Sequence, residues 1–189
     1  MKSISRRNFL RSASAISAGA VFIPNFLSCS PNKKLNMAII GVGGRGKAQW
    51  SSCLNEEGEQ VENVVALCDV DENRASEGFE KFPNAKKFAD FRIMFDEMGN
   101  SIDAVMISTP DHTHFPAAMA AMQLGKPVYV EKPLAHNIWQ LRTLRKAAKH
   151  YGVITQMGNQ GHATDGIRRV KEWYDAGITG DVKEVFAWF

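Results

Sequence analysis

A glycine-rich turn, GVGGRG at residues 41–46, places the strongest limit on how this chain can fold. Gly41, Gly43 and Gly46 directly follow the apolar run Met37–Gly41 and open a helical pattern. A side chain at the first glycine would obstruct the tight turn, one at the second would hold off a pyrophosphate, and one at the third would push the helix from the strand. Free N–H groups at the helix start favour phosphate. The spacing and its context predict a strand–turn–helix unit that binds a dinucleotide.

Short apolar runs and amphipathic stretches alternate along the rest of the chain. The apolar runs predict strands at Met37–Gly41, Val64–Asp69, Ile102–Thr109, Val128–Glu131 and Val153–Met157, with a further short strand at Phe88. Helical spacing predicts helices over Arg45–Asn55, Glu72–Phe82, Phe91–Met98, Phe115–Leu124 and Ile138–Tyr151, the last capped by Asn137 and ended by Gly152. The alternation implies right-handed crossovers and predicts an α/β fold, a Rossmann doubly wound parallel sheet.

An acidic residue closes the second predicted strand. Asp69 lies about 20 residues beyond Gly46, where a carboxylate accepts hydrogen bonds from the adenosine ribose hydroxyls. The same charge repels a 2′-phosphate, so NAD is favoured over NADP. Asp71 is the rival for this role, but it falls past the strand and is expected to cap the next helix. The alternative for the whole motif is that its glycines serve only a tight turn.

Two polar segments follow apolar strands at the edge of the sheet where ligands of open α/β folds bind. They are STPDHTH, Ser108–His114, and EKP, Glu131–Pro133. Lys132 is therefore expected at the mouth of the cofactor crevice, where its ammonium can hydrogen-bond the nicotinamide ribose and a substrate hydroxyl and take part in proton transfer. The alternative is a solvated loop lysine.

Histidine and cysteine spacing point to neither a metal site nor disulfides. His112 and His114 have H-x-H spacing, but no cysteine or further histidine lies nearby in the sequence, which favours a place beside the cofactor over zinc ligation. Three cysteines, Cys29, Cys53 and Cys68, make no disulfide framework. Cys53 and Cys68 lie in apolar segments and are expected to be buried thiols.

The N-terminus carries the pattern of an export signal. SRRNFLR, Ser5–Arg11, precedes Ala13–Ile23, an uncharged run too short to span a bilayer, which takes about 20 apolar residues. The heptapeptide resembles a twin-arginine (Tat) leader, which directs folded proteins across the bacterial inner membrane. A Tat export signal is expected over 1–29, with the Tat machinery as partner and the periplasm as destination. The alternative is a disordered basic N-terminus, and lipid anchoring at Cys29 stays open.

The positive net charge of the chain belongs to this leader. Residues 1–29 hold four of the 23 basic residues and no acidic residue, which leaves 19 basic against 20 acidic residues and a net charge of −1. This balance gives no indication of nucleic acid or an anionic membrane as a partner. The remaining length suffices for one domain with a hydrophobic core.

The segments GVGGRG, CDVD, STPDHTH and EKP, in this order, resemble the Gfo/Idh/MocA family, the group of glucose–fructose oxidoreductase and inositol dehydrogenase. The resemblance covers Lys34–Phe189. It implies a Rossmann domain, a C-terminal α/β domain with an open sheet that carries most substrate contacts, and a sugar or polyol substrate. It also implies that Lys132 helps to bind cofactor and substrate, with Glu131 and the Thr109–Pro110 turn on the nicotinamide side.

The segment TQMGNQGH looks like the crossover into that second domain, with Asn159 and His162 near the nicotinamide or the substrate. Many family members carry an arginine-rich sequence here, and the alternative for His162 is a hinge residue. The catalytic candidates are Lys132 and His162. The residues expected to bind the cofactor are Gly41, Gly43, Arg45, Gly46, Asp69, Ser108, Thr109, Pro110, His114, Glu131, Lys132 and Asn159.

The predicted organisation is an export signal over 1–29, an NAD(P)-binding Rossmann domain over 30–160 and the beginning of a C-terminal substrate domain over 161–189. In the last part Asp165 is expected to cap a helix that Gly177 ends, and residues 181–189 read as a strand. An apolar strand is an unusual end for a domain, and family members continue well beyond it. The chain is therefore expected to be truncated and inactive alone, and a full-length form to be a homo-oligomer.

Three functions stay open on these grounds. The first is a periplasmic oxidoreductase that transfers hydride from a secondary carbinol of a sugar or polyol to NAD. The second is an NAD-dependent glycoside hydrolase or lyase that oxidises a sugar transiently and uses no net NAD. The third is a non-catalytic nucleotide-binding module.

Overall fold

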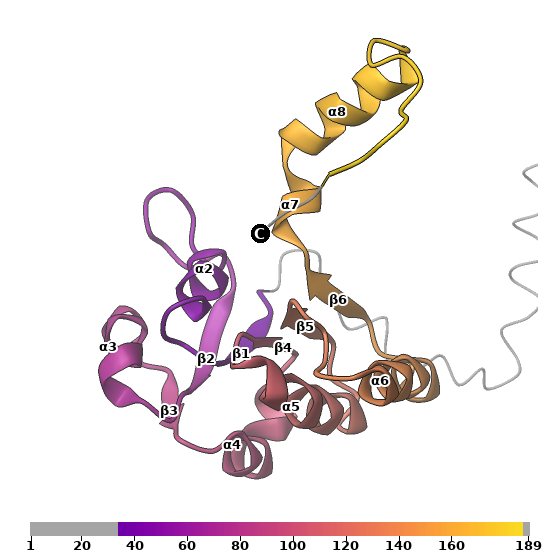
Figure 1. Cartoon of the computed structure of the whole chain (residues 1–189). Coiled ribbons are helices and arrows are strands. Elements are labelled where there is room, and N and C mark those ends of the chain that lie inside the picture. Colours follow the sequence, from indigo (N-terminus) through magenta and orange to yellow (C-terminus); the bar gives the residue numbers. More distant parts are fainter. Residues whose placement is uncertain (1–33, 187–189) are drawn as a thin grey trace, which may run out of the picture. The chain divides into compact units, whose positions relative to one another are not determined.

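A computed structural model describes residues 34–186, which are built around one sheet of six parallel strands (Figure 1). The strands are β1 (Asn36–Ile40), β2 (Asn63–Cys68), β3 (Lys86–Phe88), β4 (Ala104–Ile107), β5 (Val128–Glu131) and β6 (Thr155–Gly158). They pair in the order β3-β2-β1-β4-β5-β6. This is the order of a doubly wound Rossmann fold, with the switch between β1 and β4. The predicted fold class is confirmed.

Helices cover both faces of the sheet. These helices are α2 (Gly46–Ser51), α3 (Glu72–Lys81), α4 (Phe91–Met98), α5 (Asp111–Gln123) and α6 (Ile138–Tyr151). Two further helices, α7 (Gln160–Ala163) and α8 (Asp165–Asp175), follow β6, extend away from the sheet and bury no residue (Figure 1). Ala38 and Ile40 of β1 pack beneath α4, α5 and α6, whereas Met37 and Ile39 pack beneath α2 and α3. Because successive residues enter opposite cores, this strand is apolar at each of these positions.

Helix α6 ends as the sequence predicts, and its end sets the start of β6. The Asn137 side chain accepts from a backbone N–H of the first turn, and Gly152 adopts the left-handed conformation with φ 64° just past the helix. The N–H of Val153 then donates to the carbonyl of Ala148 at 3.1 Å. The N–H of Val153 is therefore used by the end of the helix and is not free for the sheet. The strand β6 begins at Thr155 and not at Val153 as expected.

Helix α2 is shorter than the sequence predicts. It ends at Ser51, whereas the apolar spacing extends to Asn55. The hydroxyl of Ser52 donates to the carbonyl of Gln49 at 2.6 Å. Such local side-chain bonds offer the backbone an alternative to the helix, which explains the early end.

The segment after α7 differs from two expectations. Thr164 occupies the N-cap of α8 and Asp165 is its first residue, so the prediction that Asp165 caps this helix is wrong. Its carboxylate still lies in the first turn, where its negative charge interacts favourably with the helix dipole. Residues 181–186 form no strand, because no strand within residues 34–186 pairs with them. Residues 187–189 of the expected strand, and the predicted leader with Cys29, lie outside the described residues.

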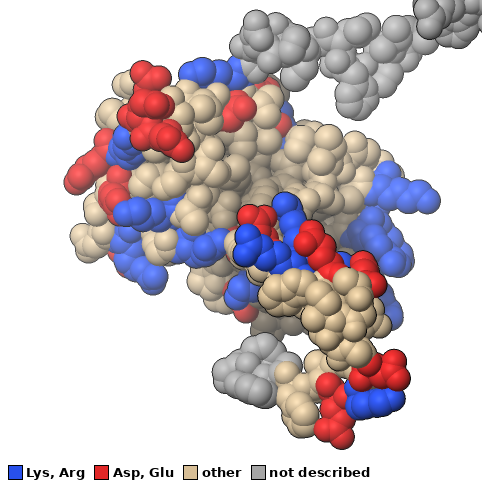
Figure 2. Space-filling view, turned by 90° about the horizontal axis from the view of Figure 1, so that it is seen from above, with Lys and Arg blue, Asp and Glu red and all other residues tan. Residues whose placement is uncertain are grey.

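Basic residues concentrate on α6 although the net charge of residues 30–189 is close to zero. Arg142, Arg145, Lys146 and Lys149 are exposed, and none of them takes part in an ion pair within the described residues. Figure 2 shows blue side chains at the edge of the body where Figure 1 places α6. None of the helices in residues 34–186 has the length and apolar character needed to cross a membrane.

Both described cysteines are buried thiols, as the sequence predicts. Cys53 is 1% exposed and Cys68 is 3% exposed. Burial disfavours the thiolate and raises the pKa of Cys53 to about 11 and that of Cys68 to about 12, with nearby carboxylates adding to the effect. Both groups are therefore thiols, not thiolates, at neutral pH.

The approach of α2 to β1 requires glycine at residue 46. A Cβ at Gly46 would lie 1.9 Å from the carbonyl oxygen of Gly41. Because that atom is backbone, the turn must shift, and Gly46→Ala should lower the free energy of unfolding by about 2 kcal/mol or more. Urea denaturation followed by circular dichroism measures this loss.

Gly166→Ala in α8 is the matched control. A Cβ there would have its nearest neighbour at 3.9 Å, so the change should not lower the free energy of unfolding and can raise it by up to about 1 kcal/mol, because alanine is the better helix former. Equal effects of the two substitutions would contradict the packing that we describe.

Candidate functional site

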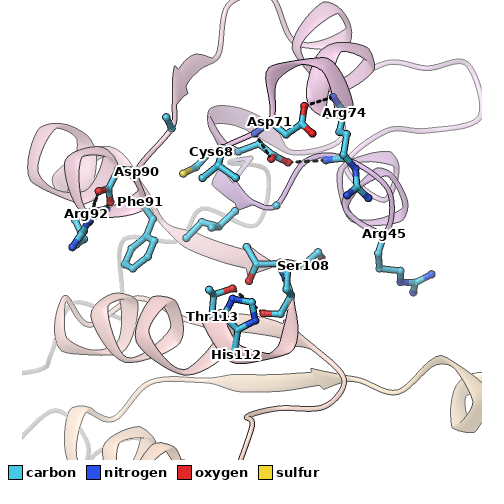
Figure 3. A pocket seen from close by; sticks show the side chains of 18 residues that line it. Arg45, Cys68, Asp71, Arg74, Asp90, Phe91, Arg92, Ser108, His112 and Thr113 are labelled. Carbon is cyan, nitrogen blue, oxygen red and sulfur yellow. Dashed lines mark hydrogen bonds and ion pairs between the residues drawn. The ribbon is translucent and has the colours of Figure 1, made fainter.

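A cavity of about 630 Å³ opens at the carboxyl ends of β1, β2 and β4. It lies at the switch point between β1 and β4, where open α/β sheets bind their ligands. In Figure 3, Arg45, Asp71 and Arg74 lie on one side of the cavity, Ser108, His112 and Thr113 on another, and Phe91, Asp90 and Arg92 at its end. The volume falls within the range of small-molecule and cofactor sites.

The glycine turn forms one wall of this cavity. Gly41 has φ 83°, and a Cβ there would lie 2.7 Å from the carbonyl carbon of Ser108, so both the turn and its contact with β4 need glycine. A Cβ at Gly43 would lie 2.7 Å from the carbonyl oxygen of Arg74. The second glycine is thus required by the approach of α3, whatever ligand it faces. Its expected contact with a pyrophosphate stays a prediction.

The carboxylate of Asp69 holds the glycine turn against the end of β2. Its Oδ2 accepts from the N–H groups of Val42 at 2.8 Å and Gly43 at 3.0 Å, and its Oδ1 accepts from the N–H of Asp71 at 3.0 Å. A carboxylate oxygen offers about two acceptor positions, so Oδ1 keeps one for a ligand hydroxyl. Asp69 lines the cavity, so that position is compatible with the expected ribose contact.

Asp71 has the capping role that the sequence predicts. Its Oδ1 accepts from the N–H groups of Asn73 and Arg74, both at 3.1 Å, at the start of α3. The guanidinium of Arg74 extends over the glycine turn, since its Nη2 would lie 3.3 Å from a Cβ placed on Gly44. A basic group therefore stands beside the two acidic ones on the β2 side of the cavity.

Two hydroxyls at the end of β4 have no partner. The Oγ of Ser108 and the Oγ1 of Thr109 are buried and make no hydrogen bond with any described residue, and both residues line the cavity. Leaving a buried hydroxyl unsatisfied costs about 1–3 kcal/mol. A polar ligand in the cavity would remove this cost, so the residues present fit a hydroxyl-rich or phosphate-bearing group such as a dinucleotide.

Arg92 and Asp90, which are two residues apart in the sequence, form an ion pair at the far end of the cavity. Arg92 Nε lies 2.9 Å from Oδ1 of Asp90, and the backbone N–H of Arg92 donates to the same oxygen. These hydrogen bonds hold the pKa of Asp90 at about 2. Asp90 therefore stays ionised at neutral pH and caps α4.

The carboxylate of Glu131 lies behind the glycine turn and is 3% exposed. Its Oε1 accepts from Arg45 Nε at 3.0 Å and Gln49 Nε2 at 2.5 Å, which both come from the turn and α2. It also accepts from Gln160 Nε2 at 2.6 Å, at the start of α7. Three donors from two distant segments thus converge on one oxygen at the end of β5.

His114 takes a position different from the one expected beside the cofactor. It is 1% exposed and does not line the cavity. Its Nδ1 lies 2.6 Å from the carbonyl oxygen of Pro133, and its Nε2 lies 2.8 Å from that of Thr109. The ring nitrogen that carries a hydrogen donates to the carbonyl beside it, and His114 thereby lies between the turn after β4 and the turn that carries Lys132.

The structure brings together only part of the predicted set. The predicted residues that line the cavity are Gly41, Gly43, Arg45, Asp69, Ser108, Thr109 and Pro110. Gly46, His114 and Glu131 lie behind them as supports, whereas Lys132, Asn159 and His162 lie outside the lining. Lys132 and His162 are exposed. Their expected catalytic roles stay predictions.

Sequence reasoning missed Gln49, Arg74 and Gln160. Gln49 is 6% exposed on the apolar side of α2, so a polar residue at a buried helical position was the available signal. Arg74 and Gln160 are set by contacts between distant segments and leave no local pattern. Within residues 34–186 no group of three or more potential ligands is placed to hold a metal ion.

The chain is similar in sequence to curated proteins that act on sugars by name. The chain is 31% identical over 171 residues to a protein of Shewanella sp. (strain ANA-3) named glycosyl hydrolase family 109 protein 1, with 75% of this chain and 37% of the relative covered. It is 26% identical over 161 residues to levoglucosan dehydrogenase of Pseudarthrobacter phenanthrenivorans, with 79% and 39% covered. The chain thus spans about two fifths of the length of these relatives.

Solved structures of inositol dehydrogenases share the fold. Myo-inositol 2-dehydrogenase from Lactobacillus plantarum superposes with a TM-score of 0.70 at 28% identity, covering 79% of this chain and 43% of that one. Scyllo-inositol dehydrogenase from Lactobacillus casei, solved with bound NAD(H) and scyllo-inositol, gives a TM-score of 0.66 at 25% identity over the same shares. The model of the oxidoreductase family with an NAD-binding Rossmann fold, GFO_IDH_MocA, matches residues 35–159. The chain therefore belongs to the Gfo/Idh/MocA oxidoreductase family.

Proposed function

We propose that this protein acts on the secondary hydroxyl of a sugar or polyol and holds NAD tightly in the cavity between β1, β2 and β4. The observation that carries the proposal is the cavity wall itself. The glycine turn, the free acceptor of Asp69 and the unpartnered hydroxyls of Ser108 and Thr109 meet there. Family membership and the inositol and levoglucosan dehydrogenases among its relatives support the choice of substrate.

The cofactor contacts follow from the chemistry of these groups. Asp69 Oδ1 would accept from an adenosine ribose hydroxyl, and the N–H groups of the glycine turn and the start of α2 would hold the pyrophosphate. Arg45 is half exposed on the cavity and would donate to the same phosphates. When bound, NAD supplies the hydride acceptor. Ser108, Thr109 and Pro110 would then line its nicotinamide half.

The proton of the substrate hydroxyl needs a group outside the cavity lining. Lys132 is exposed on the turn that His114 braces, and its ammonium can reach solvent or a ligand at the cavity mouth. We assign to the neutral amine of Lys132 the acceptance of that proton, which it would pass on to solvent, and to His162 of α7 contact with substrate or nicotinamide. Asn159 directly precedes α7 and would lie beside them.

A glycoside hydrolase that works through transient sugar oxidation is the second candidate. The relative from Shewanella sp. that carries the glycosyl hydrolase family 109 name is 31% identical to this chain. Such an enzyme would use the same cavity and the same lysine, but its NAD would be reduced and reoxidised within one turnover. The two candidates therefore differ in net NADH formation and not in cofactor binding.

We further propose that the cofactor is loaded before export. The leader over 1–29 would direct a folded protein through the Tat machinery to the periplasm, where lipid anchoring at Cys29 stays open. NAD bound in the cytoplasm would then travel in place. The full-length form would act there as a homo-oligomer on its sugar or polyol.

The function is tested in two steps. This chain should bind NAD⁺, measured by calorimetry or by quenching of its tryptophan fluorescence. A full-length form offered inositols and other sugars should develop the near-ultraviolet absorbance of reduced nicotinamide, and Lys132→Met should lower that rate about 100-fold or more because proton transfer is lost.

The outcomes separate the candidates. Release of an aglycone from a glycoside without net NADH would favour the glycoside hydrolase. A chain that folds but does not bind NAD⁺ would exclude both enzymatic functions. An unchanged rate in Lys132→Met would remove this residue from the proposed chemistry.

Asp69→Asn should weaken the preference for NAD over NADP by about tenfold, close to 1.4 kcal/mol, because it removes a charge that repels a 2′-phosphate. The ratio of the two dissociation constants, measured by calorimetry, reports this change. Asp71→Asn is the matched control, since it alters a carboxylate on the same side that caps α3. If only Asp71→Asn changed the ratio, the selecting role would pass to Asp71.

Replacing Arg6 and Arg7 by lysines should trap the precursor in the cytoplasm with NAD still bound. Cell fractionation with detection of the protein measures its location, and mass spectrometry of the purified precursor measures bound NAD. The unmodified precursor is the control. Efficient arrival of the double variant in the periplasm would refute the Tat assignment and leave the fold unaffected.

A further inference from the structure

Gln160 anchors the start of α7 to the sheet. Its Nε2 donates to Oε1 of Glu131 at 2.6 Å and lies 3.4 Å from the hydroxyl of Tyr129. Gly158, at the end of β6, packs on the same two residues, since a Cβ there would lie 2.4 Å from the Tyr129 hydroxyl and 3.0 Å from Cδ of Glu131. Residues 158–163, which we call the crossover, are therefore held on β5 by these contacts.

The acceptor that anchors the crossover is shared with the glycine turn. Oε1 of Glu131 also accepts from Arg45 at 3.0 Å and from Gln49 at 2.5 Å. A carboxylate oxygen has about two acceptor positions, so three donors compete for it. Because Glu131 is 3% exposed, water does not readily replace a donor that leaves. The strength of the Gln160 bond thus depends on where Arg45 lies.

Arg45 is the donor that a ligand can move. Its side chain is 48% exposed and lines the cavity, whereas Gln49 is buried. Only its Nε hydrogen-bonds a described residue, which leaves its terminal N–H groups for an anion. A pyrophosphate in the glycine turn would attract the guanidinium. Any shift of Arg45 toward the phosphate leaves more of the Glu131 oxygen to Gln160.

We propose that Gln160 is a positioning residue that couples dinucleotide binding at the glycine turn to the crossover, through the one Glu131 oxygen that it shares with Arg45. Binding would tighten the Gln160 bond and order the segment that carries Asn159 and His162. The inference rests on the proposed function, because it needs a dinucleotide in the cavity. It assigns to Gln160 an action through the crossover and not a contact with the reacting atoms.

Hydrogen exchange of the full chain, with and without saturating NAD⁺, tests the coupling. The N–H of His162 donates to the carbonyl of Asn159 at 3.1 Å, so it reports the order of the crossover. NAD⁺ should slow exchange about fivefold both in the glycine turn and in the crossover of the unmodified protein. In Gln160→Met, which keeps the length of the side chain and removes its amide, only the glycine turn should be slowed.

Two further variants sharpen the test. Gln156→Met is the matched control, because within residues 34–186 the Gln156 amide bonds the neighbouring Met157 carbonyl alone, so the change should leave the response of both segments intact. Arg45→Met frees the Glu131 oxygen, so it should slow exchange in the crossover even without NAD⁺. Thermal unfolding of each variant shows whether the fold is kept.

The outcomes distinguish this proposal from the proposed function. If NAD⁺ slows neither segment of the unmodified protein, the proposed cofactor site fails, and the coupling fails with it. If it slows the glycine turn but not the crossover, or if Gln160→Met still shows both effects, the coupling is overturned while the cofactor site stands.

Discussion

One carboxylate, that of Asp69, holds the cavity in shape. It joins the turn after β1 to the end of β2 through three backbone N–H groups, so neither segment can move without losing charge-assisted bonds. Each such bond contributes about 1.5–3 kcal/mol. The glycines on either side have no room for side chains, because Gly41 abuts β4 and Gly46 abuts Gly41. Contacts within the protein thus fix the shape of the glycine turn.

Glu131 joins separate segments at the end of β5, as Asp69 does at the end of β2. A buried carboxylate is costly unless donors surround it, and here the donors come from α2 and from the start of α7. The two carboxylates have different structural roles. Asp69 fixes the cavity wall, whereas Glu131 lies behind the wall and links it to the segment that leaves the sheet. His114 adds a third link by joining the turns after β4 and β5.

The predictions that held depend on local chemistry. The positive φ of Gly41, the close contact of Gly46 with Gly41, the Asp71 cap and the alternation that gives the sheet could be found because each depends on neighbours a few residues apart. The misses depend on distant partners. His114 is buried between carbonyls of two separate turns, and the close approach of Arg74 gives Gly43 a second requirement for glycine that its neighbours in the sequence do not reveal. Residues 181–186 have an apolar pattern but no neighbouring strand to pair with.

Cys53 and Cys68 lie in the two separate cores, which limits when they can form a disulfide. Cys53 packs in the core beneath α2 and α3, whereas Cys68 packs in the core beneath α4, α5 and α6. The sheet separates the two thiols, and a disulfide requires Cα atoms within about 7 Å of each other. Only an unfolded chain could bring them together. A Cys53–Cys68 disulfide recovered from an oxidising compartment would therefore mark molecules that were unfolded in that compartment.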